Sequence, residues 1–277
     1  MKKRIKFIIG FLLIILVAVF VSFYLGKNAG HNRGKIKVSG NIEATDVRLA
    51  FRVQGKIKEL LTDEGMMVKV GDVVARLETD ELAKVKAEAE AGLNAATFIY
   101  ERAQEDYVRF ENLFKAGAIS AQKRDAAKTN ADSAKANADA LRASLDLAVT
   151  RLSFADLASS LDGFILTKSA EAGEVVPVGA TIFTAADLRS IWLTAYINET
   201  DLGRVKLNQE VDVSTDTYPR KTYKGRISFI SQEAEFTPKQ IQTAEERVKL
   251  VYRIKVTIDN TNLELKPGMP ADGIIRN

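Results

Sequence analysis

The sequence lacks the cysteines and has almost none of the histidines on which thiol, triad and most transition-metal chemistry depends. Its 277 residues include no cysteine and one histidine, His31. Thiol catalysis, disulfide bonds and cysteine-ligated zinc are therefore excluded. His31 lies in KNAGHNRGK, a stretch rich in Gly and Asn that predicts a solvated linker, and there is no second histidine for a metal site or a catalytic triad. These residue counts therefore offer no thiol, triad or Cys/His metal site.

The charge of the chain gives no indication of a nucleic-acid partner. The formal net charge is +4 at pH 7, and part of it is at the extreme N-terminus. No basic stripe interleaved with aromatic residues is present, which argues against binding of DNA or RNA.

The N-terminus predicts a membrane anchor, residues 1–27. Phe7 to Leu25 is uncharged, and as a helix it would span roughly 28 Å, close to the ~30 Å of a hydrocarbon core. The basic residues before it predict a cytoplasmic N-terminus: Lys2, Lys3, Arg4 and Lys6. The alternative is a cleaved signal peptide, but the apolar core is long and Ser22-Phe23-Tyr24 is a poor cleavage site. Either interpretation places everything after Lys27 across the membrane.

Two stretches of strand-like sequence repeat each other at an offset of 108 residues. GKIKELLTDEGMMVKVGDVVARL (55–77) aligns without a gap to GFILTKSAEAGEVVPVGATIFTA (163–185). Each copy predicts two short strands with a Gly turn, and the identical pairs include Gly65/Gly173 and Gly71/Gly179. Glycine suits turn positions that need a positive φ. One copy is too small to bury a core, so we expect the two copies to close on each other. Two unrelated hairpins are the alternative.

This repeat resembles the lipoyl/biotinyl carrier fold, a flattened β sandwich of two similar halves. In carrier domains a Glu-Thr-Asp-Lys type of turn presents the lysine that takes the cofactor. Here Glu78-Thr79-Asp80 is followed by Glu81. A carboxylate cannot form the amide, so the carrier function is disfavoured.

Between the two copies the sequence predicts a helical hairpin. Apolar residues recur at alternating steps of three and four, a heptad seam, at Leu82, Val85, Ala89, Leu93, Ala96, Tyr100, Ala103, Tyr107, Phe110 and Phe114. KAGAIS (115–120) interrupts the pattern, which resumes at Ala127, Ala131, Ala134, Ala138, Leu141, Leu145, Ala148 and Leu152. A short Gly turn between two helices predicts an antiparallel pair, roughly 50 Å long. Such a thin element suits a spacer or docking arm.

The combination resembles the HlyD-type periplasmic adaptor family, also called membrane fusion proteins, over nearly the whole chain. The family has an inner-membrane anchor, a lipoyl-like domain split by a coiled-coil hairpin, and a β barrel. Many members have Arg-x3-Leu-x6-Ser at the hairpin tip, which contacts a TolC-like outer-membrane channel. Arg109, Leu113 and Ser120 of RFENLFKAGAIS have that spacing. The resemblance therefore implies that these three residues dock on the channel.

Each of these three residues also has a purely structural explanation. Arg109 could pair with Glu105 on the helix surface. Leu113 could close the end of the hairpin core. Ser120 is a natural N-cap, although Lys123 cannot complete a capping box. The sequence departs from the family at ASSLDG, where Ser159-Ser160 replace Ala-Pro before Asp162-Gly163.

The last third predicts short strands separated by turns, with a short helix in NETDLGRVKLNQ, which is the layout of the family's small β barrel. The segment 235–256 contains Phe236-Thr237-Pro238 and resembles a branch of adaptors associated with ABC-type exporters. Pro267-Gly268 predicts a tight turn before the last strand, and residues 35–44 are expected to pair with that strand. Because the chain stops at Asn277, we expect a reduced membrane-proximal part.

The predicted fold is mixed α+β and elongated, with six segments. They are the cytoplasmic tail and anchor (1–27), a linker and first strand (28–45), the two lipoyl-like halves (46–79 and 158–186), the coiled-coil hairpin (80–157, tip 109–120) and the barrel (187–277). The implied function is a non-enzymatic adaptor, without a cofactor, that bridges an inner-membrane transporter of ABC type to a TolC-like channel. Its bulk would be periplasmic in a Gram-negative bacterium, and it would self-associate into a ring, which we expect to be hexameric. The alternatives are a carrier-type enzyme subunit and an anchored coiled-coil scaffold with no role in export.

Overall fold

The computed structural model describes residues 35–236 and 250–276. The chain divides into two compact units, which we call the hairpin unit (46–187) and the barrel unit (1–45 and 188–277). Strands β1 (Ile36–Ala50) and β8 (Thr181–Asn198) have residues in both units. The expected membrane anchor lies outside the described residues. None of the helices within the described ranges combines the length and the apolar character needed to cross a bilayer.

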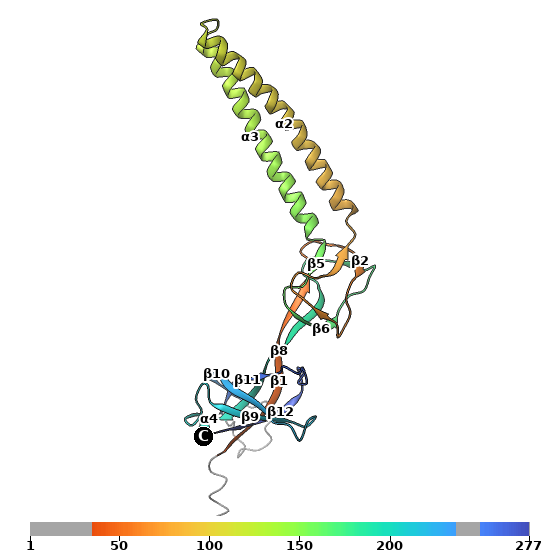
Figure 1. The fold of residues 1–277 in the computed structure, drawn as a ribbon, viewed down its shortest axis with the longest axis vertical. Coiled ribbons are helices and arrows are strands. Elements are labelled where there is room, and N and C mark those ends of the chain that lie inside the picture. The colour runs from red at the N-terminus through yellow and green to blue at the C-terminus, as the bar shows by residue number, and fades with distance from the viewer. Residues whose placement is uncertain (1–34, 237–249, 277) are drawn as a thin grey trace, which may run out of the picture. The chain divides into compact units, whose positions relative to one another are not determined.

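Two long helices form the antiparallel pair that the heptad pattern predicts (Figure 1). Helix α2 extends over Asp80–Lys115 and α3 over Ala121–Ser153. Every predicted seam residue is buried or half-buried except Val85, which is 42% exposed. The fully buried residues are all alanines, namely Ala96, Ala103, Ala131, Ala138 and Ala148. Small side chains on both helices allow the axes to approach closely, so the hairpin encloses a narrow seam.

The rest of the hairpin unit consists of short strands on either side of the helices in sequence. Before the helices come β2 (Gly55–Leu60), β3 (Met67–Val68) and β4 (Val73–Leu77); after them come β5 (Asp156–Ala158), β6 (Gly163–Lys168) and β7 (Val175–Val176). They are arranged in the orders β5-β4-β2-β7 and β8-β6-β3. The core between them includes Ile57, Leu77, Ile165, Ile182 and Phe183, each at most 1% exposed.

The predicted repeat is confirmed by reciprocal hydrogen bonds between its two halves. Gly65 N–H donates to the carbonyl of Ile165 at 2.9 Å, and Gly173 N–H donates to that of Ile57 at 2.8 Å. The strands exchange partners in the same way, because β3 pairs with β6 and β7 pairs with β2. The turn glycines all have positive φ, between 79° and 92°, as the alignment predicts: Gly65, Gly71, Gly173 and Gly179. The two halves therefore close on each other around a pseudo-twofold axis.

The described part of the barrel unit contains six strands in the order β1-β12-β9-β10-β11-β8, and β1 also pairs with β8. The remaining elements of this unit are α4 (Glu199–Leu202), β9 (Glu210–Thr215), β10 (Tyr223–Phe236), β11 (Leu250–Asp259) and β12 (Pro270–Ile275). The strands alternate between core and solvent, and fully buried aliphatic residues fill the interior. Gly40 allows β1 to approach β8, since a Cβ there would lie 1.8 Å from the carbonyl oxygen of Thr194. These strands therefore form a closed barrel.

Three local predictions for this unit are confirmed. The first strand pairs with the last, from Ile36 opposite Ile275 to Asn41 opposite Pro270. The short helix is α4. The turn before the last strand has Gly268 at φ 87°.

Candidate functional site

The hairpin tip is built around one glycine. Helix α2 ends at Lys115, and Gly117 follows with φ 68°. Gly117 N–H donates to the carbonyl of Phe114, and Ala118 N–H donates to that of Leu113, both at 2.9 Å. This pair of bonds is a Schellman motif, which satisfies the last carbonyls of the helix and needs a left-handed residue. The Gly that interrupts the heptads in the sequence thus reverses the chain at the tip.

Helix α3 begins with the predicted serine cap. Ser120 has extended φ and ψ of −74° and 153°, and its Oγ accepts a hydrogen bond from Lys123 N–H at 3.4 Å. The bond is long, so its contribution to stability is at the small end of the range for N-caps. The cap uses only one lone pair of the hydroxyl, and Ser120 is exposed.

The three residues expected to dock on a channel are all exposed and near the turn. The side chain of Arg109 is 63% exposed, and Leu113 is 38% exposed. They lie one turn apart and therefore on the same face of α2. The predicted pairing of Arg109 with Glu105 is wrong. The ion pair of Arg109 is with Asp106, three residues earlier, where Nη1 lies 3.5 Å from Oδ1. Leu113 also does not close the hairpin core, because its side chain is too exposed.

One residue of the tip was missed by the sequence analysis. Arg124 of α3 reaches across to α2, where its Nη1 lies 3.7 Å from Glu111 Oε2 and its guanidinium carbon lies 4.6 Å from the ring centre of Phe114. Its side chain is 27% exposed. The sequence did contain a signal for this contact, because Glu111 and Arg124 have opposite charges and lie at nearly equal distances on either side of Gly117. Arg124 ties the two helices together directly below the exposed docking candidates.

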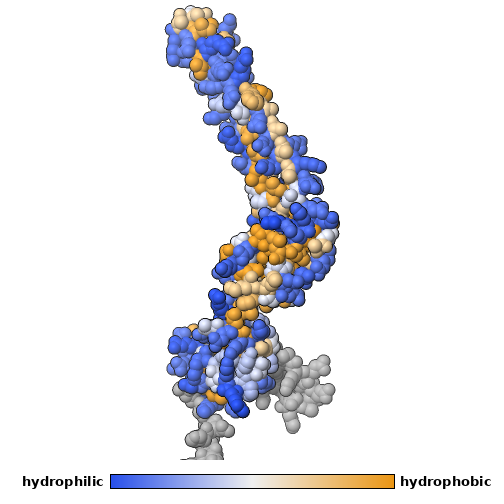
Figure 2. Space-filling view, turned by 45° about the vertical axis from the view of Figure 1, so that its right-hand side comes forward, coloured by the Kyte–Doolittle hydropathy of each residue, from blue (hydrophilic) through white to orange (hydrophobic). Residues whose placement is uncertain are grey.

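The tip therefore offers a mixed polar and apolar surface to solvent. Figure 2 shows apolar residues at this end of the hairpin among polar ones. A short turn between two capped helices, braced by Arg124, presents Arg109, Leu113 and Ser120 to solvent. Such an arrangement can contact another protein with a cation, an apolar side chain and a hydroxyl.

The position of the carrier lysine is occupied by the start of the hairpin. Glu81 is the second residue of α2 and is exposed. Glu78 pairs with Lys56, with Oε1 and Nζ 2.7 Å apart. The chain thus leaves β4 directly into a helix instead of forming the turn of a carrier. Across residues 35–236 and 250–276, no group of three or more His, Cys, Asp or Glu is placed to hold a metal.

Two known domain families match separate parts of the chain. Residues 72–157 match the YBHG alpha-helical hairpin domain, and residues 191–272 match the YknX-like beta-barrel domain. Between them the two matches cover more than half of the sequence. The first includes both helices and the tip, and the second includes most of the barrel strands.

Solved structures have the same fold. The membrane fusion protein Spr0693 from Streptococcus pneumoniae R6 is 17% identical, with a TM-score of 0.70 over 87% of this chain and 99% of that one. A MacA–MexA chimeric protein that contains the Pseudomonas aeruginosa MexA alpha-hairpin domain is 23% identical, with a TM-score of 0.65 over 88% and 81%. MacA from Actinobacillus actinomycetemcomitans is 23% identical, with a TM-score of 0.59 over 89% and 81%. Taken together with the two domain matches, these likenesses show that the chain belongs to the membrane fusion protein, or periplasmic adaptor, family.

Proposed function

We propose that this adaptor is the bridging subunit of a tripartite efflux or secretion system. It joins an inner-membrane transporter of the ABC type to a TolC-like outer-membrane channel. Residues 1–27 anchor the chain in the inner membrane as a single span with the N-terminus in the cytoplasm, and the remainder lies in the periplasm of a Gram-negative bacterium. The subunit performs no chemistry and needs no cofactor. Its role is to connect the two membrane proteins mechanically.

The hairpin tip provides the main support for channel docking. Arg109, Leu113 and Ser120 have the spacing of the family's channel-contact motif, and all three side chains are exposed beside the turn. The pairing of Arg109 with Asp106 at 3.5 Å is a weak surface contact, worth under about 1 kcal/mol. The guanidinium can therefore exchange this partner for one on a channel.

The proposed assembly is a hexameric ring, and exposed apolar residues at both edges of the hairpin unit support the self-association that it needs. Met67 and Val70 follow the first Gly turn and are 50% and 64% exposed; their repeat counterparts Val175 and Val178 are 75% and 63% exposed. β7 is at one end of its sheet and β5 is at the other. The turn after β3 bonds to Ser159, next to β5, so the two apolar pairs lie at opposite edges. Apolar patches at opposite edges suit a head-to-tail contact, which forms a ring when the rotation between neighbouring subunits closes.

The ABC type of the transporter rests on the sequence alone. Phe236-Thr237-Pro238 and the following Thr-x-Glu-Glu-Arg at 243–247 resemble the branch of adaptors associated with ABC-type exporters. Residues 237–249 lie outside the described residues.

The docking proposal is tested by crosslinking from the tip. Because the chain has no cysteine, Ala118→Cys provides a unique thiol beside the turn. Labelled with a photoactivatable crosslinker in cells, it should form an adduct with the outer-membrane channel, and Arg109→Asp in the same chain should abolish both the adduct and export. The matched control is Arg102→Asp, because Arg102 is 74% exposed and also pairs with Asp106, at 3.8 Å, two turns further from the tip.

Normal abundance of both variants in immunoblots is required for this comparison. If Arg109→Asp left the adduct and export unchanged, the docking proposal would be wrong, and a scaffold without an export role would be favoured. A lipoyl or biotinyl adduct in the intact mass would instead favour a carrier subunit.

A further inference from the structure

Helix α3 has a second row of heptad positions on the face directed away from α2. Residues two apart along a helix are about 200° apart around it, so the positions on either side of buried Ala138 lie opposite the seam. This outer row is exposed and uncharged: Thr129, Ser133, Ala136, Ala140, Ala143 and Leu147. The lysines, arginines and aspartates of α3 all lie outside it. A helix with two uncharged heptad rows is suited to two helical partners.

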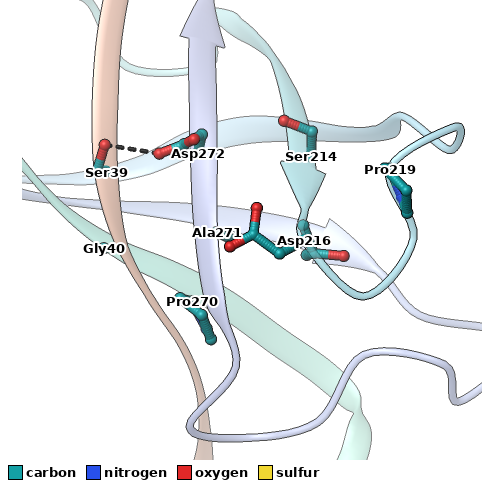
Figure 3. A pocket seen from close by; sticks show the side chains of 9 residues that line it. Ser39, Gly40, Ser214, Asp216, Pro219, Pro270, Ala271 and Asp272 are labelled. Atoms are coloured by element: carbon teal, nitrogen blue, oxygen red, sulfur yellow. Dashed lines mark hydrogen bonds between the residues drawn. The ribbon is translucent and has the colours of Figure 1, made fainter.

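The outer face of α2 has one large apolar side chain. Phe98 lies two residues after buried Ala96, so it points away from α3, and it is 70% exposed. Exposed polar side chains need no protein partner; in the hollow beside β12 of the barrel unit, Asp216 and Asp272 are exposed to solvent (Figure 3). One exposed phenylalanine is also ordinary on a protein surface. Phe98 becomes informative through its position relative to the outer row of α3.

Residues equally far in sequence from the Gly117 turn lie at the same height along the hairpin. Arg124 and Glu111, which are in contact, are seven residues after the turn and six before it. Further down, a Cβ at Gly92 would lie 3.9 Å from Leu141, and these positions are 25 residues before the turn and 24 after it. The same rule therefore gives the height of every residue on either outer face.

The two outer faces are complementary in size at equal heights. Phe98 is level with Ala136, since both are 19 residues from Gly117. Leu147 is the large apolar residue of the α3 row, at 52% exposed, and it is level with Ala87 on the outer face of α2. Each large side chain on one outer face thus corresponds to an exposed alanine on the other.

The net charges of the two helices are also complementary. Helix α2 contains eight acidic and five basic residues, whereas α3 contains four acidic and six basic ones. Contact between α2 of one chain and α3 of another is therefore favoured over contact between two copies of the same helix.

We infer that a second copy of this chain packs its α2 against the outer face of α3, with Phe98 beside Ala136. Copies related by rotation about an axis along the hairpins keep equal heights, so the contact can repeat around a ring. This inference rests on the proposed self-association of the adaptor and adds a helical contact to the one at the strand edges.

The contact is tested by crosslinking in the full chain in detergent, which has no native cysteine. Ala91 and Ala143 are exposed, lie on the two outer faces and are level with each other. Within one hairpin they point apart, roughly 20 Å from each other. A short bismaleimide should therefore join Ala91→Cys/Ala143→Cys chains into a ladder of covalent oligomers. The control is Ala91→Cys/Ala126→Cys, whose second site is on the same face but roughly 25 Å further along, and it should give no ladder.

Single variants determine which faces meet. Ala91→Cys and Ala143→Cys should each fail to crosslink alone, and a mixture of the two should give covalent dimers. Efficient crosslinking of either variant with itself would show that identical faces meet and would overturn the inference.

The role of Phe98 is measured by sedimentation velocity. Phe98→Ser should weaken self-association about tenfold or more, because a large apolar side chain no longer becomes buried in the contact. Ile99→Ser is the matched control, since Ile99 is 61% exposed but about 100° further around α2, and it should change the association less than about twofold. Ala140→Leu fills the outer row of α3 without touching the seam and should also weaken association. Circular dichroism checks that each variant keeps its helices.

The outcomes separate this contact from the rest of the proposed function. A ring that forms without the crosslink between the level sites, or that tolerates Phe98→Ser, overturns the helical contact alone. A chain that stays monomeric overturns both the contact and the proposed ring. Docking of the tip on a channel is decided separately, by the crosslinks from Ala118→Cys.

Discussion

The amide of Gly65 donates a hydrogen bond to the carbonyl of Ile165, and the amide of Gly173 returns the same bond to Ile57. Each bond joins the turn of one repeat to the strand of the other. The hairpin interrupts the sequence between them, yet the two halves need each other to satisfy their turns. The helical arm is therefore inserted into a single folding unit, whose halves must meet before either is complete.

Replacing these glycines should destabilise the hairpin unit without any steric clash. Gly65 and Gly173 have φ of 79° and 92°, and no atom of the described residues lies within 4 Å of the place a Cβ would take at either. Gly65→Ala or Gly173→Ala should lower the free energy of unfolding by about 1–2 kcal/mol, since only the left-handed backbone is penalised.

Gly92→Ala is the matched control, because Gly92 is inside α2 and alanine there should stabilise by about 0.5–1 kcal/mol. Urea unfolding followed by circular dichroism measures all three variants. A turn variant as stable as its parent would contradict this account of the turns.

Because the two helices approach closely, replacing a buried alanine and replacing an exposed one should have different effects on stability. Ala131 is 2% exposed in the seam, whereas Ala140 is exposed on the same helix. Ala131→Leu should cost about 1–3 kcal/mol, because the added methylenes force the helices apart. Ala140→Leu should stay within about 0.5 kcal/mol, since leucine and alanine have similar helix propensity. Thermal unfolding of both variants decides the matter, and an Ala131→Leu protein as stable as its parent would show that the seam is loosely packed.

The repeat shows how far the sequence could predict this fold. The offset of 108 residues predicted the turn glycines. The structure adds another equivalent pair at the same offset, Phe51 and Ser159. Their carbonyls accept hydrogen bonds from the amides of Gly179 and Gly71, respectively. The alignment stopped short of that pair because the two side chains have nothing in common. Ser159 departs from the family pattern, yet it is 3% exposed and its Oγ donates to the Leu161 carbonyl at 2.7 Å. This hydrogen bond of the Ser159 hydroxyl holds the local turn, and it could not be predicted from the residue types alone.

Contacts between side chains were harder to predict from the sequence than helices and strands. Arg109 had acidic neighbours both three and four residues earlier, and the choice of Asp106 depends on rotamers that helical spacing does not determine. The link between Arg124 and Glu111 required the exact alignment of two helices across the turn.

The barrel should lose stability in acid partly through one aspartate of β9. Asp212 on β9 accepts hydrogen bonds from Lys224 of β10 and from Arg276, and these contacts, Lys224 first, lower the pKa of its carboxyl from 3.8. A folded-state pKa below the unfolded one stabilises the fold above about pH 4, and this stabilisation is lost as the pH falls through the lowered pKa. Asp212→Asn should therefore cost about 1 kcal/mol at neutral pH and flatten the decline below about pH 4.

The control for this prediction is Glu199→Gln, which removes an exposed carboxylate from the same unit. Its urea midpoint should follow the parental pH profile. An Asp212→Asn protein with an acid decline as steep as that of its parent would assign the decline to other carboxylates. Glu264 is the first of these to examine, since its hydrogen bonds from Lys221 and Tyr223 also lower its pKa.

The last prediction concerns Arg124 as a positioning residue for the docking tip. Its ion pair with Glu111 and its stacking on Phe114 should together stabilise the closed tip by about 1 kcal/mol. Arg124→Gln should therefore speed hydrogen exchange at the Gly117 and Ala118 amides about fivefold, while the base of the hairpin is unchanged.

Arg142→Gln is the matched control, since Arg142 is on the same helix, 63% exposed, and pairs with Asp139 at 3.9 Å on its own helix. If Arg124→Gln weakened crosslinking from the tip while Arg109 remained in place, docking would depend on the shape of the tip as well as on its exposed side chains. If exchange rose equally along both helices, Arg124 would stabilise the hairpin generally and would have no specific role in holding the tip.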